Sequence, residues 1–177
     1  MVILLNEKEE SKMNIEDRLN YIETGILKLS YFRKEIDSDG TQRFYNEKGQ
    51  IHRDNDLPAI IWNNGDQYWY QNDKCHRDND LPAVIMANGD QGWYQNDKLH
   101  RDNDLPAVID AYGDQYWYQN GKRHRDNDLP TVITADGDQV WYKNDKCHRD
   151  NDLPAVIDAD GTQEWYQNGN LSFLYHT

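Results

Sequence analysis

The amino-acid sequence predicts an all-β protein: an elongated, single-layer, twisted antiparallel sheet of repeated β-hairpins, a solenoid-like meander preceded by one short helix. A repeated string is the first observation behind this prediction, because His-Arg-Asp-Asn-Asp-Leu-Pro recurs every 24 residues. The second is that every copy holds two short β-type segments bounded by turn dipeptides. The third is that only 37% of the chain is hydrophobic, too little for a thick core. The five strings begin at His52, His76, His100, His124 and His148.

Each copy predicts a strand, a turn, a second strand and a second turn. In the first copy the strands fall near residues 58–62 and 67–71, and Asn64-Gly65 between them suits a two-residue hairpin turn in which both residues have positive φ. A second turn at Asn72-Asp73 leads the chain into the next copy. Because neighbouring strands lie about 4.8 Å apart, the array should form a ribbon of about 12 strands, on the order of 55–60 Å long.

The copies account for residues 52–171, and the flanking segments divide the rest of the chain. Residues 1–25 predict an N-terminal segment with a short amphipathic helix that stops at Gly25. Residues 26–51 resemble a degenerate copy and predict a capping hairpin, with Phe44 in the place of the repeated Trp. Residues 172–177 predict a C-terminal capping strand, because an exposed sheet edge needs a cap.

Alternation along a strand assigns the two faces of the sheet. Leu57, Ala59 and Ile61 should share one face, whereas Ile60 and Tyr70 should line the other. One Trp recurs without variation in the second strand of each copy, and we expect this column to form the core on the Leu/Ala/Ile face. Its members are Trp69, Trp93, Trp117, Trp141 and Trp165.

Two columns vary from copy to copy, and they are the positions where partner contacts are expected. The first variable column, expected to face solvent, comprises Trp62, Met86, Asp110, Thr134 and Asp158. The second variable column comprises Tyr68, Gly92, Tyr116, Val140 and Glu164. A protein partner that binds along these columns would distinguish copies that are otherwise nearly identical.

The repeated histidines and arginines favour a structural ladder. Each His should bond to a neighbouring turn, and Arg53 should lie beside Asp54, Asp56 or Asp78 of the next copy. A His-Arg-Asp string also opens the catalytic loop of protein kinases, but this sequence has neither a Gly-rich nucleotide loop nor an Asp-Phe-Gly motif. Because an active site is normally assembled once from unlike residues, we expect no enzyme, no catalytic residue and no cofactor.

Metal binding is a weaker hypothesis than the ladder. Histidines about 10 Å apart cannot share one zinc ion, so no metal site is predicted from them. The repeated Asp54-Asn55-Asp56 could offer oxygen ligands, and calcium is retained only as a minor alternative. Cys75 and Cys147 occupy the same place three copies apart, about 30 Å, so they should be free thiols that serve as small buried residues.

Charge and hydropathy narrow the class of partner and the location. A net charge of -13 and a pI of about 4.7 disfavour nucleic acid and anionic lipid surfaces, and the five copies carry -11 of that charge. No run of about 20 apolar residues is present, so stable membrane insertion is not expected. The short apolar stretch at residues 1–5 does not form a signal-peptide core, which leaves an intracellular, cytoplasmic location as the expectation.

The block Trp-Tyr-x-Asn-(Asp/Gly)-Lys-x-His, followed by a strand and an x-Gly turn, resembles the MORN (membrane occupation and recognition nexus) repeat over roughly residues 26–175. The copies depart from that family's usual pattern at Arg53-Asp54-Asn55-Asp56-Leu57-Pro58, where glycines are common. This HRDxDxPA variant is similar to repeats in giant amoebal viruses and some bacteria, and in a viral protein the expected location becomes the host cytoplasm. The resemblance implies a β-hairpin fold and a scaffold without enzymatic activity.

Two functions remain open at this point. The first is protein–protein interaction with an unidentified partner through an extended acidic, aromatic surface. Its partner-binding residues would be Trp62, Tyr68, Met86, Asp110, Tyr116, Thr134, Asp158 and Glu164. The alternative is a sugar- or choline-binding module that uses the Trp and Tyr columns, since the copies also resemble choline- and glucan-binding hairpin repeats.

Overall fold

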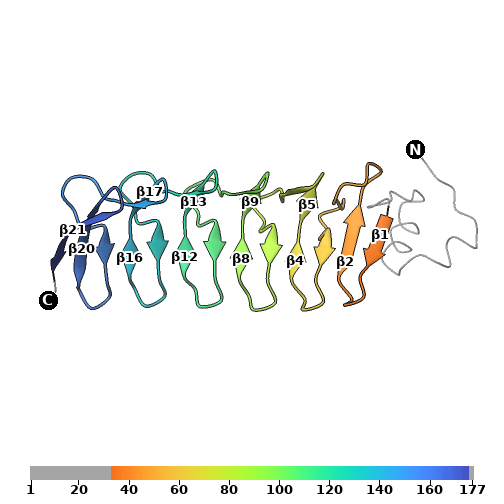
Figure 1. Cartoon of the computed structure of the whole chain (residues 1–177), viewed down its shortest axis with the longest axis horizontal. Coiled ribbons are helices and arrows are strands. Elements are labelled where there is room, and N and C mark those ends of the chain that lie inside the picture. The colour runs from red at the N-terminus through yellow and green to blue at the C-terminus, as the bar shows by residue number, and fades with distance from the viewer. Residues whose placement is uncertain (1–32, 176–177) are drawn as a thin grey trace, which may run out of the picture.

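The structure is a computed structural model that describes residues 33–175, and all regular elements in this range are β-strands. The strands follow one another in a long row, with the first hairpin at one end and the last strand at the other (Figure 1). The predicted all-β hairpin array is therefore confirmed. The N-terminal helix expected before Gly25 lies outside the described residues.

A hairpin of β1 (Arg33–Ile36) and β2 (Gln42–Tyr45) precedes the first full copy. The first copy then contributes β3 (Ile60–Ile61), β4 (Gln67–Tyr68), β5 (Tyr70–Gln71) and β6 (Lys74–Cys75). The same four strands recur in the next three copies as β7 (Val84–Ile85), β8 (Gln91–Gly92), β9 (Tyr94–Gln95), β10 (Lys98–Leu99), β11 (Val108–Ile109), β12 (Gln115–Tyr116), β13 (Tyr118–Gln119), β14 (Lys122–Arg123), β15 (Val132–Ile133), β16 (Gln139–Val140), β17 (Tyr142–Lys143) and β18 (Lys146–Cys147). The last copy supplies β19 (Val156–Ile157), β20 (Gln163–Gln167) and β21 (Asn170–Tyr175).

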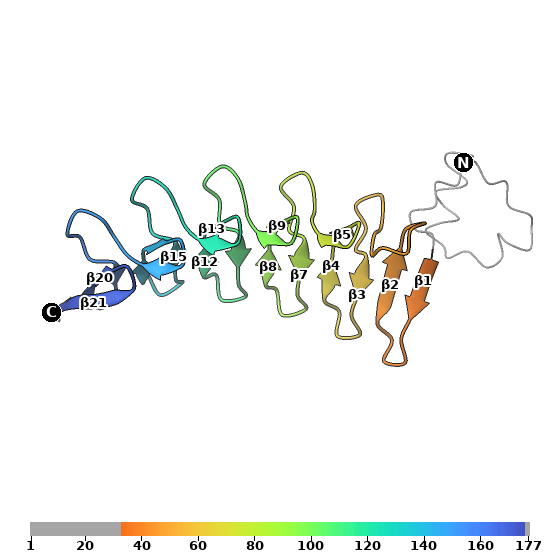
Figure 2. The same ribbon diagram turned by 45° about the horizontal axis from the view of Figure 1, so that its top comes forward.

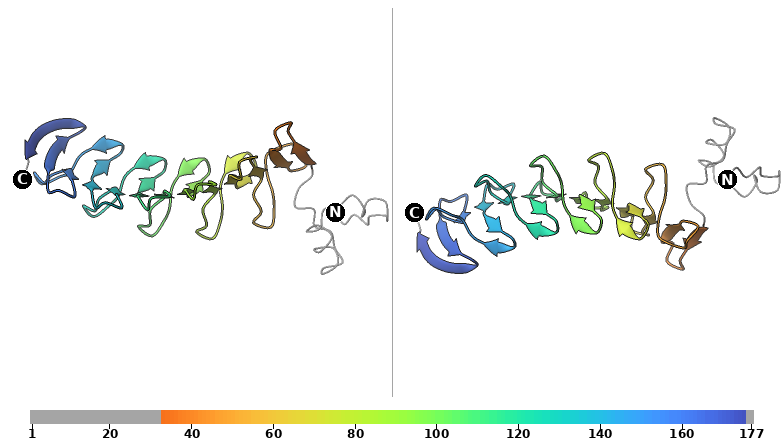
Figure 3. Two further views of the ribbon diagram at one scale, coloured as in Figure 1. Left: turned by 90° about the horizontal axis from the view of Figure 1, so that it is seen from below. Right: turned by 90° about the horizontal axis from the view of Figure 1, so that it is seen from above.

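The first two strands of every copy join one continuous antiparallel sheet of 13 strands, in the order β1-β2-β3-β4-β7-β8-β11-β12-β15-β16-β19-β20-β21. Consecutive strands in this order keep one register, since Ile60 pairs with Tyr68 and Tyr68 pairs with Val84 of the next copy. Each strand therefore contacts only its neighbours, as expected for a repeat protein. Views from below and from above show the row of strands turning gradually from one end to the other (Figure 3).

The third and fourth strands of the first four copies form a second row that the sequence did not predict. β5 and β6 pair only with each other, as do β9 and β10, β13 and β14, and β17 and β18. These small hairpins lie along one margin of the main sheet, and the loops of the His-Arg-Asp strings project beside them (Figure 2). The second row is also linked between copies, because the amide of Asp97 donates to the carbonyl of Cys75 at 3.0 Å.

The turn types differ from those expected. The Asn64-Gly65 turn is a three-residue loop, in which the Trp62 amide donates to the Asp66 carbonyl at 2.9 Å and only Gly65 has positive φ. The expectation of a two-residue turn there was wrong, because the strands end one residue earlier on each side. The two-residue turn with both φ values positive is at Asn72-Asp73 (φ 52° and 66°), where these residues tolerate the left-handed conformation.

The core is thin and lies under the Trp column. Trp69, Trp93, Trp117 and Trp141 are 6–7% exposed, and Ala59, Ala83, Ala107 and Ala155 are fully buried. The other face is also packed, since Ile60, Val84 and Val132 are 6–7% exposed. The assignment of the Leu column to the core was wrong: Leu81, Leu105, Leu129 and Leu153 are 37–38% exposed. These leucines lie in the loop before the strand, where alternation does not hold.

The final strand takes the place of a further copy. Phe173 stands where Arg77 and its equivalents stand in the array, and it packs edge-on against Trp165, with ring centroids 5.1 Å apart. β21 pairs with β20 along its length, with a bulge between Trp165 and Tyr166. The five-residue β20 and six-residue β21 are the longest strands of the sheet.

Candidate functional site

The arginine of the repeated string forms the junction between successive copies. Nε and Nη2 of Arg77 donate to the two carboxylate oxygens of Asp56 at 2.6 and 2.8 Å, and its guanidinium lies 3.8 Å above the Trp69 ring. Nη1 also donates to the Pro82 carbonyl at 3.1 Å. The ladder is thus present, but Arg77, Arg101, Arg125 and Arg149 each bind an Asp of the preceding copy, and not one of their own or the next copy as expected. Arg53, which has no full copy before it, stacks 3.8 Å above Phe44.

The same junction is built three more times. The Arg, Asp and Trp that meet are Arg101, Asp80 and Trp93, then Arg125, Asp104 and Trp117, and finally Arg149, Asp128 and Trp141. Each Trp also donates from Nε1 to a loop carbonyl, at 3.0 Å from Trp69 to Asp56. Hydrogen bonds from the guanidinium lower the pKa of Asp56, Asp80 and Asp104.

The histidines connect the loop to the neighbouring hairpin. Nε2 of His52 lies 3.0 Å from Asp54, and its Nδ1 accepts from the amide of Asn72 at 3.2 Å. With Nδ1 accepting from the amide, Nε2 is the ring nitrogen placed to donate to Asp54. His100 and His148 make the same amide contact, whereas Nδ1 of His76 and His124 has no hydrogen-bond partner. The expected bond to a neighbouring turn is present in those three copies.

The carboxylates of the array mostly bind the array itself. Asp66 accepts from the amide of Ala87 in the next hairpin tip at 2.8 Å, and Asp97 accepts from the amide of Cys75 at 2.8 Å. Asp78 accepts from Gln71 and contacts His76, and these two hydrogen bonds lower its pKa. Within residues 33–175 no group of three or more His, Cys, Asp or Glu side chains is placed to hold one metal ion.

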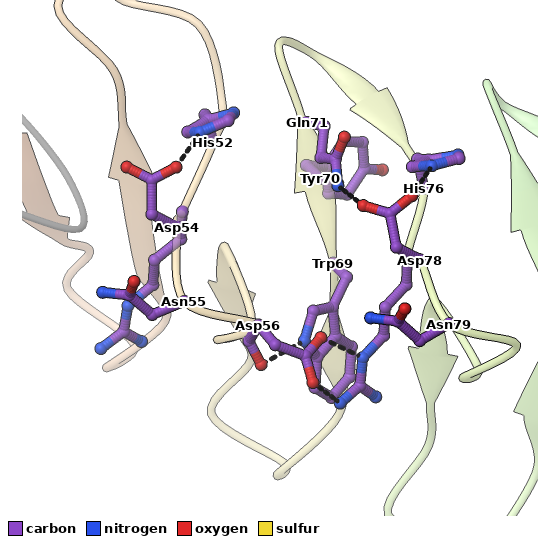
Figure 4. Close-up of a pocket in the computed structure, with 12 residues that line it drawn as sticks. His52, Asp54, Asn55, Asp56, Trp69, Tyr70, Gln71, His76, Asp78 and Asn79 are labelled. Atoms are coloured by element: carbon purple, nitrogen blue, oxygen red, sulfur yellow. Dashed lines mark hydrogen bonds and ion pairs between the residues drawn. The ribbon is translucent and has the colours of Figure 1, made fainter.

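Clefts separate consecutive His-Arg-Asp loops. The cleft between the first two loops has a volume of about 340 Å³, and two equivalent clefts further along have volumes of about 210 Å³ each. Figure 4 shows the side chains of the first cleft, where His52 and Asp54 face each other on one loop and His76 and Asp78 do so on the next. The Trp69 ring lies at the base, next to the ion pair that Asp56 makes.

The Trp column is closed to a stacking ligand in the four junctions. One ring face of Trp69, Trp93, Trp117 and Trp141 carries an arginine at 3.8–3.9 Å, and the rings are 6–7% exposed. A sugar or choline group would have to displace that guanidinium. Of the Trp column, only the half-buried Trp165, which packs against Phe173, carries no arginine from residues 33–175, so the alternative function would depend on Trp165 and the half-buried tyrosines.

The two variable columns come together on the face that carries the Ile60 and Val84 side chains. Trp62 lies edge-on to Tyr68, with ring centroids 6.3 Å apart, and the Tyr116 hydroxyl is 3.5 Å from the Asp110 carboxylate. Trp62 and Met86 are 37% and 36% exposed. Asp110, Tyr116, Thr134, Asp158 and Glu164 are half-buried along the same face.

The polarity of this face changes along the array. Trp62 and Met86 make its first part apolar, and the guanidinium of Arg43 lies 5.4 Å from the Trp62 ring. At the far end desolvation raises the pKa of Asp158, and the nearby carboxylates of Asp138, Asp160 and Glu164 raise it further. This end therefore holds negative charges that repel one another.

Sequence reasoning missed one exposed aromatic residue. Tyr112, at the tip of the third hairpin, is 86% exposed and stands where the other copies carry Asn64, Asn88, Asp136 and Asp160. The signal was present, because this turn position varies in the same way as the two columns. Tyr112 belongs with the candidate partner-binding residues.

The cysteines are free, as expected. Cys75 is buried and Cys147 is half-buried. Burial raises the pKa of the Cys75 thiol to about 12 and that of Cys147 to about 11. Both groups are protonated thiols near neutral pH, which does not suit a nucleophile.

No membrane-spanning helix is found among residues 33–175. Comparison with protein-family models gives no match for this chain, and comparison with curated proteins gives none either.

Proposed function

We propose that the chain is a non-enzymatic, MORN-like repeat scaffold that binds a protein partner along the extended face formed by its two variable columns. The observation that carries the proposal is that invariant and variable residues of each copy have different places in the structure. The invariant His, Arg, Asp and Trp bond to adjacent copies or loops, whereas the residues of the two variable columns lie on one face.

A scaffold function fits this division better than catalysis does. The polar groups that could perform chemistry are repeated, and most are engaged in hydrogen bonds that hold the copies together. A face that changes from apolar at Trp62 to acidic at Asp158 and Glu164 suits a partner whose own surface changes from apolar to basic. A cytoplasmic location is part of this proposal, since both thiols are free.

Substitutions on the variable face test the proposal. Trp62→Ala, Met86→Ala and Asp158→Ala together should abolish capture of the partner from the source cell while leaving the far-UV circular dichroism unchanged. A matched control replaces Lys98, Lys122 and Lys146 by Ala, because these exposed residues recur unchanged on the second-row hairpins. If the variable-face variant still binds and deletion of residues 1–25 removes binding, the interface lies in the N-terminal segment.

The alternative small-ligand function is tested separately. A panel of glycans and choline compounds that gives no binding to the full chain would leave protein binding as the proposal. If a glycan or choline compound does bind, the Tyr column is changed to Phe. Unchanged affinity of that compound would argue against recognition through the tyrosine hydroxyls.

A further inference from the structure

The two edges of the 13-stranded sheet differ in character. β1 carries Arg33, Lys34 and Glu35 on a four-residue strand, and charged side chains are a common means of keeping a sheet edge from pairing. β21 has six residues, all of them exposed, and none of their side chains is charged. Within residues 33–175, β21 pairs only with β20, so its outer edge has no strand beside it.

The exposed surface of β21 is mostly apolar. Leu171, Phe173, Leu174 and Tyr175 are 53%, 56%, 40% and 50% exposed. Long, uncharged edge strands with exposed apolar side chains are templates for pairing with another strand. Among residues 33–175 the sheet therefore has one charged edge at β1 and one uncharged, unpaired edge at β21.

Strand direction decides how a second copy could use this edge. All neighbouring strands of the sheet are antiparallel and their number is odd, so β1 and β21 run in the same direction. Head-to-tail joining of β21 to β1 of another copy, with the two sheets facing the same way, would give a parallel pair, and an antiparallel head-to-tail pair would exchange the faces of the second sheet. Two β21 strands related by a two-fold axis would instead continue the antiparallel alternation of the sheet.

Charge also favours this pairing. Any antiparallel register between two β21 strands opposes only uncharged side chains, and a register centred on Leu174 sets Phe173 opposite Tyr175 of the second copy. The nearest strand acid is Glu164 on β20, directly across from Leu174. Its counterpart in the second copy would lie three strand spacings away, about 14 Å, which exceeds the Debye length of about 8 Å at physiological salt.

We propose that two copies of this chain associate tail to tail through antiparallel pairing of their β21 strands, forming one continuous 26-stranded sheet. The dimer leaves only the charged β1 edges at its ends, so association stops at two copies. The contact is one strand wide and buries a small area, so we expect the dimer to be weak and its population to depend on protein concentration.

Sedimentation equilibrium of the full chain from about 1 to about 500 µM tests this proposal, because weak interfaces dissociate within that range. The mass should rise from 21.0 kDa to twice that value and reach a plateau. Small-angle scattering should show the maximum dimension of the sheet growing from about 60 to about 120 Å, as end-to-end joining requires.

Leu174→Lys should hold the protein at 21.0 kDa, because two lysines would face each other across the new pair. The new lysine can pair with Glu164 on the adjacent strand, and Tyr175→Lys repeats the test if Leu174→Lys does not fold. Ile36→Lys, on the opposite edge and 63% exposed in the wild type, is the matched control and should dimerise normally.

Three results would overturn the proposal: a wild-type mass of 21.0 kDa at every concentration, dimerisation of Leu174→Lys as strong as that of the wild type, or a mass that rises past two copies without a plateau.

Discussion

Replacing Arg101 by Ala removes the centre of one junction and tests whether the ladder holds the array together. The Arg101 side chain is 14% exposed, donates to both oxygens of Asp80 at 2.7 and 2.8 Å, and lies 3.9 Å above Trp93. Because Asp80 is 47% exposed, solvent screening limits the ion pair to about 0.5–1 kcal/mol. Stacking on the buried ring adds about 1–2 kcal/mol. We expect Arg101→Ala to cost about 2–3 kcal/mol of unfolding free energy once packing of its aliphatic stem is included.

Urea unfolding followed by far-UV circular dichroism measures this cost. Arg101→Lys keeps the charge and most of the stem but loses the bidentate fork and the stacking, so its cost should be about 1 kcal/mol. Lys98→Ala, which changes an exposed residue of the preceding copy, is the control and should stay within about 0.5 kcal/mol of the wild type. An Arg101→Ala midpoint equal to that of Lys98→Ala would refute the structural role of the ladder.

Three further predictions concern acid, backbone conformation and thiol chemistry. Arginine hydrogen bonds lower the pKa of Asp56, Asp80 and Asp104 below the ordinary 3.8, so this stabilisation is complete above the unfolded pKa and is lost as pH falls through the folded pKa. The melting temperature should therefore fall below about pH 4, and an equal melting temperature at pH 6 and pH 3 would contradict this. Asn96→Ala should cost about 1–2 kcal/mol in urea unfolding because φ is 50° there, whereas Asn96→Gly should be nearly neutral; equal costs would remove the conformational explanation. Burial raises the pKa of Cys75 to about 12, so the native thiol should react with iodoacetamide at least about tenfold more slowly than the denatured one, a ratio that peptide mapping measures. Similar native and denatured rates would show that Cys75 is accessible.

The repeat period was enough to predict much of the fold. A 24-residue unit with two β-type segments and two turns leaves few arrangements other than consecutive hairpins, and the 13-stranded sheet follows from it. The second row of hairpins was missed because strands of two residues, such as β5 and β6, are too short to produce an alternation pattern. The leucines were misplaced for a related reason, since alternation was extended through Pro58 into a loop.

The turn chemistry shows where local sequence preference is ambiguous. Asn-Gly and Asn-Asp both suit positive φ. In the first copy, however, Asn72 has positive φ and Asn64 does not. The pairing of Ile61 with Gln67 leaves five residues to connect the strands, and that length selects the looser loop. Strand register decides this choice, and register depends on contacts between copies.

The candidate site was predictable in its columns but not in its contacts. Variation among copies identified Trp62, Tyr68 and the other members of the face from sequence alone. The Asp that each Arg binds could not be predicted, because every copy repeats the same acids and the sequence does not tell which copy's Asp lies beside a given Arg. The shielding of Trp69 by Arg77 likewise depends on how the loops stack.

The most direct test of the division between ladder and face is quantitative capture from the source cell with three forms of the chain. The wild type and the Lys98→Ala, Lys122→Ala, Lys146→Ala control should retain the same partner. The Trp62→Ala, Met86→Ala, Asp158→Ala variant should lose it while its urea midpoint stays close to that of the control. Retention of the partner by the variable-face variant, or its loss from the lysine control, would contradict the assignment of binding to the variable columns.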